Sequence, residues 1–376
     1  MSGPLSPLLA PLTVPASWIY RAGVAWRNRR FDRGAARAER LPLPVISVGN
    51  ITAGGVGKTP MVVWLARRLH ERGVRPLIAL RGYGAASPAD SDEAREYAEL
   101  VPFAGRAVGA DRVRSVVAAL AQAGRRDGGA ERPPDEPPSS LACDCILLDD
   151  GFQHRRVARD LDLVLVDARR CGLRDGLLPA GWLREPSSAL RRATAVVVMH
   201  TECTDAARRQ ELAAQIRAAH GRAPIAWFEH RWQGLERIEP GTDPGATPEA
   251  QPGAARGTGG TRREPLEWFA GRRVVTLLGI GNPTGIAERL ALAGAEVVGN
   301  LPVGDHQQYS LGDGERACRT AADCGADTIV TTRKDWTKLA RFASEFTLPV
   351  AIPELEVTPS EGGEALLALV ASVLRR

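Results

Sequence analysis

Residues 45–60 read Val45-Ile-Ser-Val-Gly-Asn-Ile-Thr-Ala-Gly-Gly-Val-Gly-Lys-Thr-Pro60. The stretch begins as a short apolar strand, continues as a glycine-rich loop and ends in residues typical of a helix start. Such a loop turns successive backbone N–H groups toward an anion, and the positive end of the helix adds to the attraction. The pattern predicts a phosphate-binding loop, with Lys58 on the terminal phosphates and Thr59 on Mg²⁺. The expected loop residues are Thr52, Ala53, Gly54, Gly55, Val56, Gly57, Lys58 and Thr59.

Lysine is rare in this chain, which makes Lys58 informative. Of the 49 basic residues 46 are arginines, and the three lysines are Lys58, Lys334 and Lys338. An ammonium group is compact enough to enter a nest of backbone N–H groups, whereas a planar guanidinium is not. We therefore expect bound nucleotide here, rather than a glycine-rich turn that binds nothing.

The loop departs from the strict G-x-x-x-x-G-K-[ST] spacing, which would put glycine at Thr52. Its Gly-Gly-Val-Gly-Lys-Thr core resembles the loops of MinD-like and metallochaperone P-loop proteins, many of which carry a further lysine where this chain has Ala53. A nucleotide-driven switch of that branch, with membrane attachment, is the main alternative, and Ala53 argues against it. A GTPase is a third possibility, but Thr332-Arg-Lys-Asp335 only approximates the guanine-reading motif.

Length and composition indicate two α/β domains. The chain has 376 residues, of which 44% are apolar, enough for two cores. Apolar runs that alternate with helical segments predict parallel sheets covered on both faces. The runs lie at 76–80, 144–148, 163–166 and 195–199, then at 273–278, 296–298, 328–331 and 349–352. The six cysteines form no C-x-x-C pair, which indicates ordinary thiols in a reducing compartment.

Three segments between these runs need separate interpretation. Residues 125–140 and 239–264 are rich in Gly, Pro and polar residues, and we expect mobile surface loops there. The run 224–232 is a candidate strand connecting the two domains. Gly279-Ile-Gly-Asn-Pro-Thr-Gly285 is similar to a dinucleotide fingerprint, but its third glycine is one place late, so we interpret it as a tight turn.

The N-terminal arm carries the basic excess of the chain. Residues 21–40 hold seven arginines against Asp32 and Glu39, which equals the net charge of +5 for the whole chain. The preceding apolar segment, 5–20, is broken by prolines, too short to span a bilayer and unlike a signal peptide. An apolar segment with Trp18 and Tyr20 beside arginines fits a lipid headgroup boundary, and a helix packed on the domain with a solvated basic face fits as well. No module for nucleic acid is present in the sequence, so we expect no such partner.

An acidic pair follows one of the buried runs. Asp149-Asp150-Gly-Phe-Gln-His154 comes directly after Cys145-Ile-Leu-Leu148, so both carboxylates should emerge at the carboxyl end of a strand. Mg²⁺ bound to nucleotide phosphates is met at that edge in P-loop folds. We therefore expect Asp149 and Asp150, with Thr59, to be the metal ligands.

Together these motifs identify a family. The chain resembles the tetraacyldisaccharide 4'-kinases, the lipid A 4'-kinases, over nearly its whole length. The resemblance rests on 47–60, Leu80-Arg-Gly-Tyr-Gly84, 149–155, Leu183-Arg-Glu-Pro186, 279–283, Asp305-His306 and Lys334-Asp335. It implies an ATP- and Mg²⁺-dependent kinase that phosphorylates the 4'-hydroxyl of an acylated glucosamine disaccharide 1-phosphate. It also implies a P-loop core with a mostly parallel sheet, joined by a strand-like hinge to a smaller C-terminal α/β domain.

The resemblance also implies the roles of single residues. Asp92, in Ser91-Asp-Glu-Ala94, stands where the family has its catalytic carboxylate within Gly-Asp-Glu-Pro, and His306 is its implied partner. The loss of Gly and Pro changes the backbone angles allowed around Asp92. The implied substrate ligands are Arg81, Tyr83, Arg112, Arg184 and Glu185.

The implied organisation has three parts. Residues 1–40 would be a basic, membrane-associating arm, 41–222 the P-loop kinase core, and 223–376 the smaller domain, with the hinge and a disordered insertion near 239–264. The expected partners are the acylated disaccharide lipid and the anionic surface of the inner membrane. We expect a monomer at the cytoplasmic face of that membrane, as a peripheral or monotopic protein.

Overall fold

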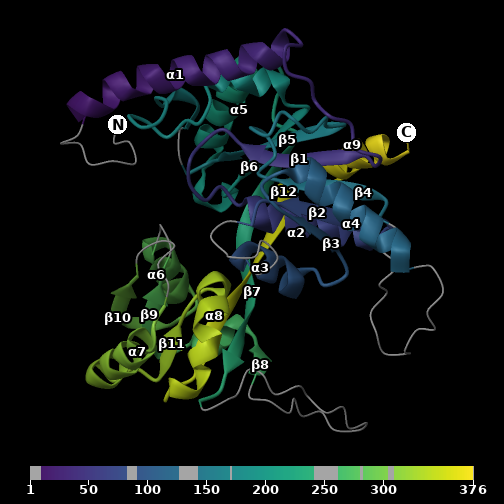
Figure 1. The fold of residues 1–376 in the computed structure, drawn as a ribbon. Coiled ribbons are helices and arrows are strands. Elements are labelled where there is room, and N and C mark those ends of the chain that lie inside the picture. The colour runs from purple at the N-terminus through teal and green to yellow at the C-terminus, as the bar shows by residue number, and fades with distance from the viewer. Residues whose placement is uncertain are drawn as a thin grey trace. The chain divides into compact units, whose positions relative to one another are not determined.

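The computed structural model describes residues 10–82, 91–126, 143–169, 172–240, 261–279, 283–303 and 309–375 (Figure 1). The chain forms two compact units, one of Met1–His230 with Val357–Arg376 and the other of Arg231–Glu356. Both boundaries lie inside strands, in β7 (Ala226–Ile238) and β12 (Val350–Glu361). The C-terminal segment thus belongs with the first unit, which its place in the sequence does not reveal.

The first unit is built on a parallel sheet. In the described residues its strand order is β7-β6-β5-β1-β4-β2-β3, and every neighbouring pair runs parallel. The strands before β7 are β1 (Val45–Asn50), β2 (Pro76–Leu80), β3 (Gly105–Val108), β4 (Cys145–Asp149), β5 (Leu161–Asp167) and β6 (Ala195–Met199). The carboxyl ends of parallel strands share one edge, so the residues that follow β1, β4, β5 and β6 lie along the same side of the sheet.

Helices cover both faces of this sheet, as the continuous apolar strands predict. Alternate residues of β1 separate the two cores, since Ile46 packs with α2, α3 and α9 while Val45 packs with α4. Helix α5 covers the same face as α4, over β5 and β6. The helices are α2 (Lys58–His70), α3 (Asp92–Leu100), α4 (Arg112–Arg126), α5 (Ala206–His220) and α9 (Gly363–Leu374).

The N-terminal helix α1 (Ala10–Asp32) is held on the first unit by hydrogen bonds of its polar side chains. The Ser17 hydroxyl donates to the Leu177 carbonyl at 3.1 Å and accepts from the Ala180 N–H at 3.0 Å. The Tyr20 hydroxyl donates to the Arg184 carbonyl at 3.0 Å. In the part of the chain that the structure describes, no helix is long and apolar enough to cross a membrane.

The second unit has its own parallel strands, in the order β10-β9-β11-β12. These are β9 (Arg273–Leu278), β10 (Glu296–Pro302) and β11 (Thr328–Val330), and the helices beside them are α6 (Pro283–Leu292), α7 (Leu311–Cys324) and α8 (Arg333–Leu339). Trp336 and Ala317 pack on one side and Leu290 on the other. Strand β8 (Thr261–Glu264) pairs antiparallel with β7. The prediction of a loop over 239–264 is therefore wrong for its last four residues, which form a strand. Residues 241–260 and 127–142 lie outside the described residues.

Short 3₁₀ turns complete the two units. They are η3 (Gly172–Arg174), η4 (Ser187–Arg192), η5 (Thr201–Cys203), η6 (Leu266–Phe269) and η7 (Ala340–Glu345). The turn η5 follows β6 directly, so it belongs to the carboxyl edge of the first unit's sheet.

Candidate active site

The loop after β1 has the backbone of a phosphate cradle. Gly54 and Gly57 adopt the left-handed conformation, with φ of 100° and 90°, which favours glycine at both positions. Gly57 also caps the N-terminus of α2, whose first residue is Lys58. A Cβ atom at Gly57 would lie 2.8 Å from Nε2 of His230, so only glycine fits there. The chain therefore fits a bound nucleotide phosphate at the start of α2.

The first half of the loop explains why threonine replaces the expected glycine. Thr52 forms an antiparallel bridge with Leu183, and the Ala53 N–H donates to the Trp182 carbonyl at 2.7 Å. The Asn50 side chain holds the Thr52 carbonyl at 2.8 Å. Paired, extended backbone of this kind requires no glycine. Thr52 and Ala53 therefore anchor the loop, and the glycines after them turn it.

Lys58 and Arg184 both form ion pairs with Asp150. The Lys58 ammonium nitrogen lies 3.4 Å from Oδ1 of Asp150. The Arg184 guanidinium donates to both carboxylate oxygens of Asp150 at 3.0 Å. Burial acts to raise the pKa of Asp150, but Lys58 and Arg184 outweigh it and the pKa is lowered. Asp150 is therefore ionised beside the loop.

Asp149 lies in a drier environment. It is 8% exposed, and its Oδ2 accepts a hydrogen bond of 2.9 Å from the Tyr97 hydroxyl. Burial raises the pKa of Asp149 to about 6, against the opposing effect of Lys58. Its other oxygen, Oδ1, is buried and has no hydrogen-bond partner among the described residues. A buried oxygen of this kind suits a hard cation such as Mg²⁺, which oxygen ligands bind.

Tyr97 is a site residue that the sequence analysis missed. The Thr59 side chain lies close enough to act on the pKa of this hydroxyl, so Tyr97 adjoins two of the expected metal ligands. Burial and Asp149 raise its pKa well above 10.0, so it stays protonated and donates. A tyrosine in the apolar stripe of a helix is typical of a core residue, and no sequence signal separates this one from that group.

Two residues after β5 also support the loop. The Arg169 guanidinium donates to the Gly55 carbonyl at 3.3 Å and to Oδ2 of Asp167 at 2.8 Å. Asp167 is the last residue of β5, so it fixes Arg169 against rigid backbone. Both residues lie at the carboxyl end of a strand, a position that favours a role in the site, but the sequence analysis did not predict that role.

Arg112 is placed near the acidic pair. It begins α4, is 4% exposed and donates to the Gly109 carbonyl at 3.0 Å. Burial lowers its pKa, while Asp149 and Asp150 act to raise it, and Arg81 is close enough to lower it further. The Arg112 Nε atom has no hydrogen-bond partner in the described part of the chain. Two arginines near one another with a spare donor fit a phosphate.

Glu185 has a different environment from the other expected substrate ligands. Its side chain is fully buried, and its oxygens contact Arg27 at 3.1 Å and Arg192 at 2.9 Å. The Asn28 amide donates to it at 2.8 Å. Both oxygens are thus engaged, and two of the three donors lie on α1. These contacts attach α1 to the segment that carries Arg184.

The remaining expected residues are described in part or not at all. Asp92 is the first residue of α3, whose cap is Ser91 accepting from the Ala94 N–H at 3.3 Å. The side chain of Asp92 lies outside the described residues, as do Tyr83 and His306. The same short helix carries Tyr97, so the backbone of Asp92 and the support of Asp149 belong to one element.

Comparison with known proteins gives a consistent result. The family described as tetraacyldisaccharide-1-P 4'-kinase matches residues 9–374. A tetraacyldisaccharide 4'-kinase of Syntrophus aciditrophicus is 36% identical over 359 residues, covering 93% of this chain and 90% of the relative. One from Anaeromyxobacter dehalogenans strain 2CP-C is 38% identical over 342 residues, covering 90% and 83%. The crystal structure of LpxK from Aquifex aeolicus in complex with ATP matches with a TM-score of 0.66 and 25% identity, covering 97% and 99%.

Proposed function

We infer the activity from the premise that this chain belongs to the tetraacyldisaccharide-1-P 4'-kinase family, which matches it from residue 9 to residue 374. It is an ATP-dependent kinase of lipid A biosynthesis. It transfers the γ-phosphate of ATP to the 4'-hydroxyl of a tetraacylated glucosamine disaccharide 1-phosphate. This activity replaces the nucleotide-driven switch that the phosphate loop alone left open.

For the nucleotide, we propose that residues 52–59 hold the phosphates of ATP and that Lys58 contacts the terminal ones. Thr59 and Asp149 would hold Mg²⁺, and Asp150 would hold it directly or through water. Bound Mg²⁺ supplies positive charge that offsets the charge of the phosphate oxygens during transfer. The protein's own part is to keep Lys58 and the two carboxylates in fixed positions, which Tyr97 and Arg184 support by their hydrogen bonds.

For the acceptor, we propose that Arg81, Tyr83 and Arg112 bind the phosphate and sugar of the disaccharide. The spare Nε donor of buried Arg112 supports this assignment. Arg184 would act through its ion pair with Asp150, and Glu185 through its attachment of α1, so both would be positioning residues. A buried, fully engaged carboxylate such as Glu185 has no lone pair to offer a sugar hydroxyl.

For proton transfer, we propose that Asp92 accepts the proton of the 4'-hydroxyl and that His306 assists it. A carboxylate paired with a histidine can hold a suitable proton affinity for this step. The family pattern around both residues is the support for the assignment, and α3 gives Asp92 a rigid backbone position.

We further propose that α1 binds the surface of the inner membrane from its cytoplasmic face. The buried residues of α1 are small or of medium size, namely Thr13, Ser17 and Val24, each 8% exposed. The opposite side exposes large apolar side chains, at 72% for Leu12, 77% for Ile19 and 63% for Trp26. These three recur every seven residues and so lie on one stripe of the helix.

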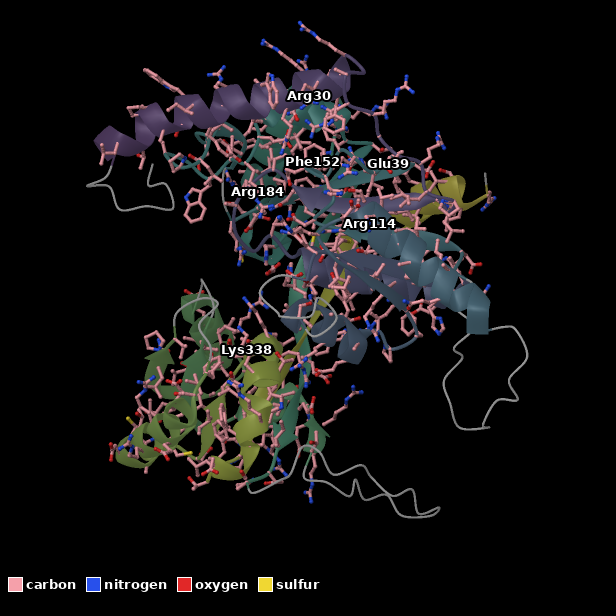
Figure 2. All side chains as sticks on the ribbon, viewed as in Figure 1. Arg30, Glu39, Arg114, Phe152, Arg184 and Lys338 are labelled. Atoms are coloured by element: carbon pink, nitrogen blue, oxygen red, sulfur yellow. The ribbon has the colours of Figure 1, made fainter. Side chains whose placement is uncertain are left out.

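An apolar stripe turned to solvent needs another surface to cover it. Trp18, 69% exposed, adds an aromatic ring suited to the headgroup boundary. Arg29 and Arg30 are exposed near the end of α1 and add charge for anionic lipids, and Figure 2 shows Arg30 on this helix. A membrane that also contains the acylated substrate is the partner that fits both features. One such helix per chain is sufficient, so we propose that the protein acts there as a monomer.

The site assignment is tested by lipid phosphorylation in mixed micelles. Asp92→Asn and His306→Ala should each lower kcat by about 10²- to 10⁴-fold, the usual contribution of acid–base groups, with little change in ATP binding. Glu71→Gln, at the C-terminal cap of α2, and His220→Ala, at the end of α5, are the matched controls. Full kcat in Asp92→Asn would contradict the assigned base.

A further inference from the structure

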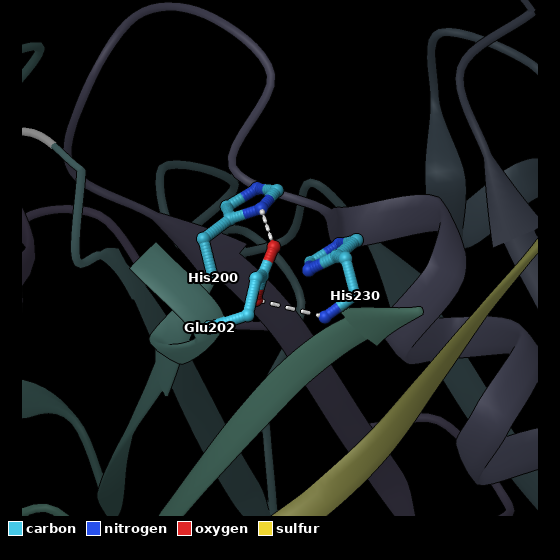
Figure 3. Close-up of side chains that lie close together, drawn as sticks. All are labelled: His200, Glu202 and His230. Atoms are coloured by element: carbon cyan, nitrogen blue, oxygen red, sulfur yellow. Dashed lines mark hydrogen bonds and ion pairs between the residues drawn. The ribbon is translucent and has the colours of Figure 1, made fainter. Parts of the chain in front are cut away.

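Three side chains that the kinase reaction does not use converge at the carboxyl edge of the first unit's sheet (Figure 3). His200 directly follows β6, Glu202 lies in the turn η5, and His230 lies in β7. One ligand atom from each lies within 4.8 Å of the others. Two imidazoles and one carboxylate from separate elements thus meet at one point.

Both histidine side chains are buried. His200 is 7% exposed and His230 is 4% exposed. The His200 Nε2 atom has no hydrogen-bond partner among the described residues, and its Nδ1 lies 3.5 Å from Oε1 of Glu202. Buried polar nitrogens of this kind cost free energy unless a hydrogen bond or a metal ion satisfies them.

Glu202 is held in place as a ligand would be. Its Oε2 accepts a hydrogen bond of 3.0 Å from the backbone N–H of His230, which leaves Oε1 directed at His200 (Figure 3). The backbone of His230 and the ring of His200 thus lie on either side of the carboxylate and fix its position.

The backbone at His200 is strained. Its φ of 62° and ψ of 41° place it in the left-handed region, which a residue with a large side chain adopts rarely and at a cost. Strained residues of this kind occur preferentially at binding sites. The ring of His200 stacks on the ring of His230, with 3.7 Å between their centroids and 12° between their planes.

We propose that His200, Glu202 and His230 form a binding site for a transition-metal ion of the zinc class. Two imidazole nitrogens with one carboxylate are a common ligand set for Zn²⁺, with water in the fourth position, whereas Mg²⁺ prefers oxygen ligands alone. A metal lies in the plane of each imidazole that binds it, so one ring turns out of the stack on binding. The three ligand atoms then move together to suit metal–nitrogen distances of about 2.0–2.1 Å.

The site would border the phosphate loop. His230 packs against Gly57, so closely that a Cβ atom there would lie 2.8 Å from its Nε2. Turning the His230 ring on metal binding would therefore change the surface behind the cradle. The proposed ligands share no residue with the Mg²⁺ site expected at Thr59, Asp149 and Asp150.

The test is a titration of metal-free, untagged protein with Zn²⁺ in excess Mg²⁺ and without nucleotide, followed by calorimetry. We expect one equivalent to bind, with affinity at least tenfold weaker in His200→Asn, His230→Ala and Glu202→Gln. Asparagine tolerates the left-handed backbone, so His200→Asn removes the ligand without adding strain. Circular dichroism checks that each variant is folded. Co²⁺ in place of Zn²⁺ should give a visible d–d spectrum that the same variants lose.

Two further variants act as controls. His220→Ala removes a partly buried histidine on α5, and Cys203→Ser removes an exposed thiol next to Glu202. Both should bind Zn²⁺ like the unaltered protein. Absence of stoichiometric binding, equal binding by the three ligand variants, or a loss confined to Cys203→Ser would overturn the proposal.

Discussion

Replacing Tyr97 by phenylalanine tests how the metal-binding carboxylate is held. The substitution deletes one atom, the hydroxyl oxygen that donates to Oδ2 of Asp149 at 2.9 Å, and leaves the buried ring in its core. A hydrogen bond to a charged group contributes about 1.5–3 kcal/mol. Because this bond favours the ionised carboxylate, its loss raises the pKa of Asp149 further.

The magnitude follows from the free energy lost. At 1.36 kcal/mol per pKa unit, about 1.5–3 kcal/mol would move the pKa of Asp149 upward by about 1 to 2. Since burial already places it at about 6, the ionised fraction at pH 7 would fall about two- to tenfold. We expect kcat/KM at pH 7 to fall by the same factor and to recover at pH 9.

The assay is the pH profile of kcat/KM for lipid phosphorylation between pH 5 and 9, which reports ionisations of the free enzyme. Tyr20→Phe is the matched control, because it deletes a tyrosine hydroxyl that donates to a backbone carbonyl and not to a carboxylate. The acid limb should move to higher pH in Tyr97→Phe alone. An unmoved acid limb, or a loss of rate that is equal at all pH values, would refute the reasoning.

Three further predictions concern stability and lipid binding. Burial raises the pKa of Asp149 from 3.8 to about 6, so its contribution to stability is complete below pH 3.8 and is lost as the pH rises through about 6. Above pH 6, Asp149→Asn should therefore have a higher free energy of unfolding than the unaltered protein, by about 3 kcal/mol at most in urea denaturation, although it loses activity. Equal free energies of unfolding at pH 8 would contradict the burial argument. Glu185→Gln leaves Arg27 and Arg192 without their carboxylate, and we expect the free energy of unfolding in urea to fall by about 2–3 kcal/mol. This is less than the usual cost of breaking a buried ion pair, because both arginines are partly exposed. A fall under about 0.5 kcal/mol would exclude a stabilising cluster. The double variant Trp18→Ser, Ile19→Ser should bind vesicles of anionic lipid at least tenfold more weakly in co-sedimentation, whereas Leu292→Ser, an exposed apolar residue of the second unit, should not; equal binding by both would rule out α1 as the contact.

The sequence predicted the strands that are buried on both faces. Strands β2 and β6 have the bounds read from the apolar runs 76–80 and 195–199, because a strand with helices on both faces is apolar throughout. Strand β3 was missed for the same physical reason: its residues alternate, with Arg106 exposed, so it contains no continuous apolar run. A strand could thus be predicted where its residues form a continuous apolar run.

The candidate site was predictable where the backbone imposes the residue type. Gly54 and Gly57 need positive φ, and Asp149 ends a buried strand, so both features leave a mark on the sequence. Tyr97 and Glu185 leave none, because their roles depend on partners that are distant in the chain: Asp149 for Tyr97, and Arg27 for Glu185. Only the fold brings these pairs together.

The N-terminal helix shows a related limit. Its sequence was compatible with a packed helix and with a membrane-binding one, since apolar and basic residues are interspersed. The structure places Thr13 and Ser17 inward, together with Val24, and leaves the large apolar side chains of Trp18 and Ile19 exposed. That orientation depends on which face finds hydrogen-bond partners in the segment 177–184, which the sequence of the helix alone does not contain.

The most direct test of the account is transfer of labelled γ-phosphate from Mg·ATP to detergent-dispersed tetraacyldisaccharide 1-phosphate by the purified protein. The account predicts label on the lipid, at the 4'-position, that requires both Mg²⁺ and the lipid and is lost in Lys58→Ala. Lys338→Ala, which removes a lysine of the second unit, should keep the activity. ATP hydrolysis that proceeds without the lipid and leaves no label on it would contradict the account.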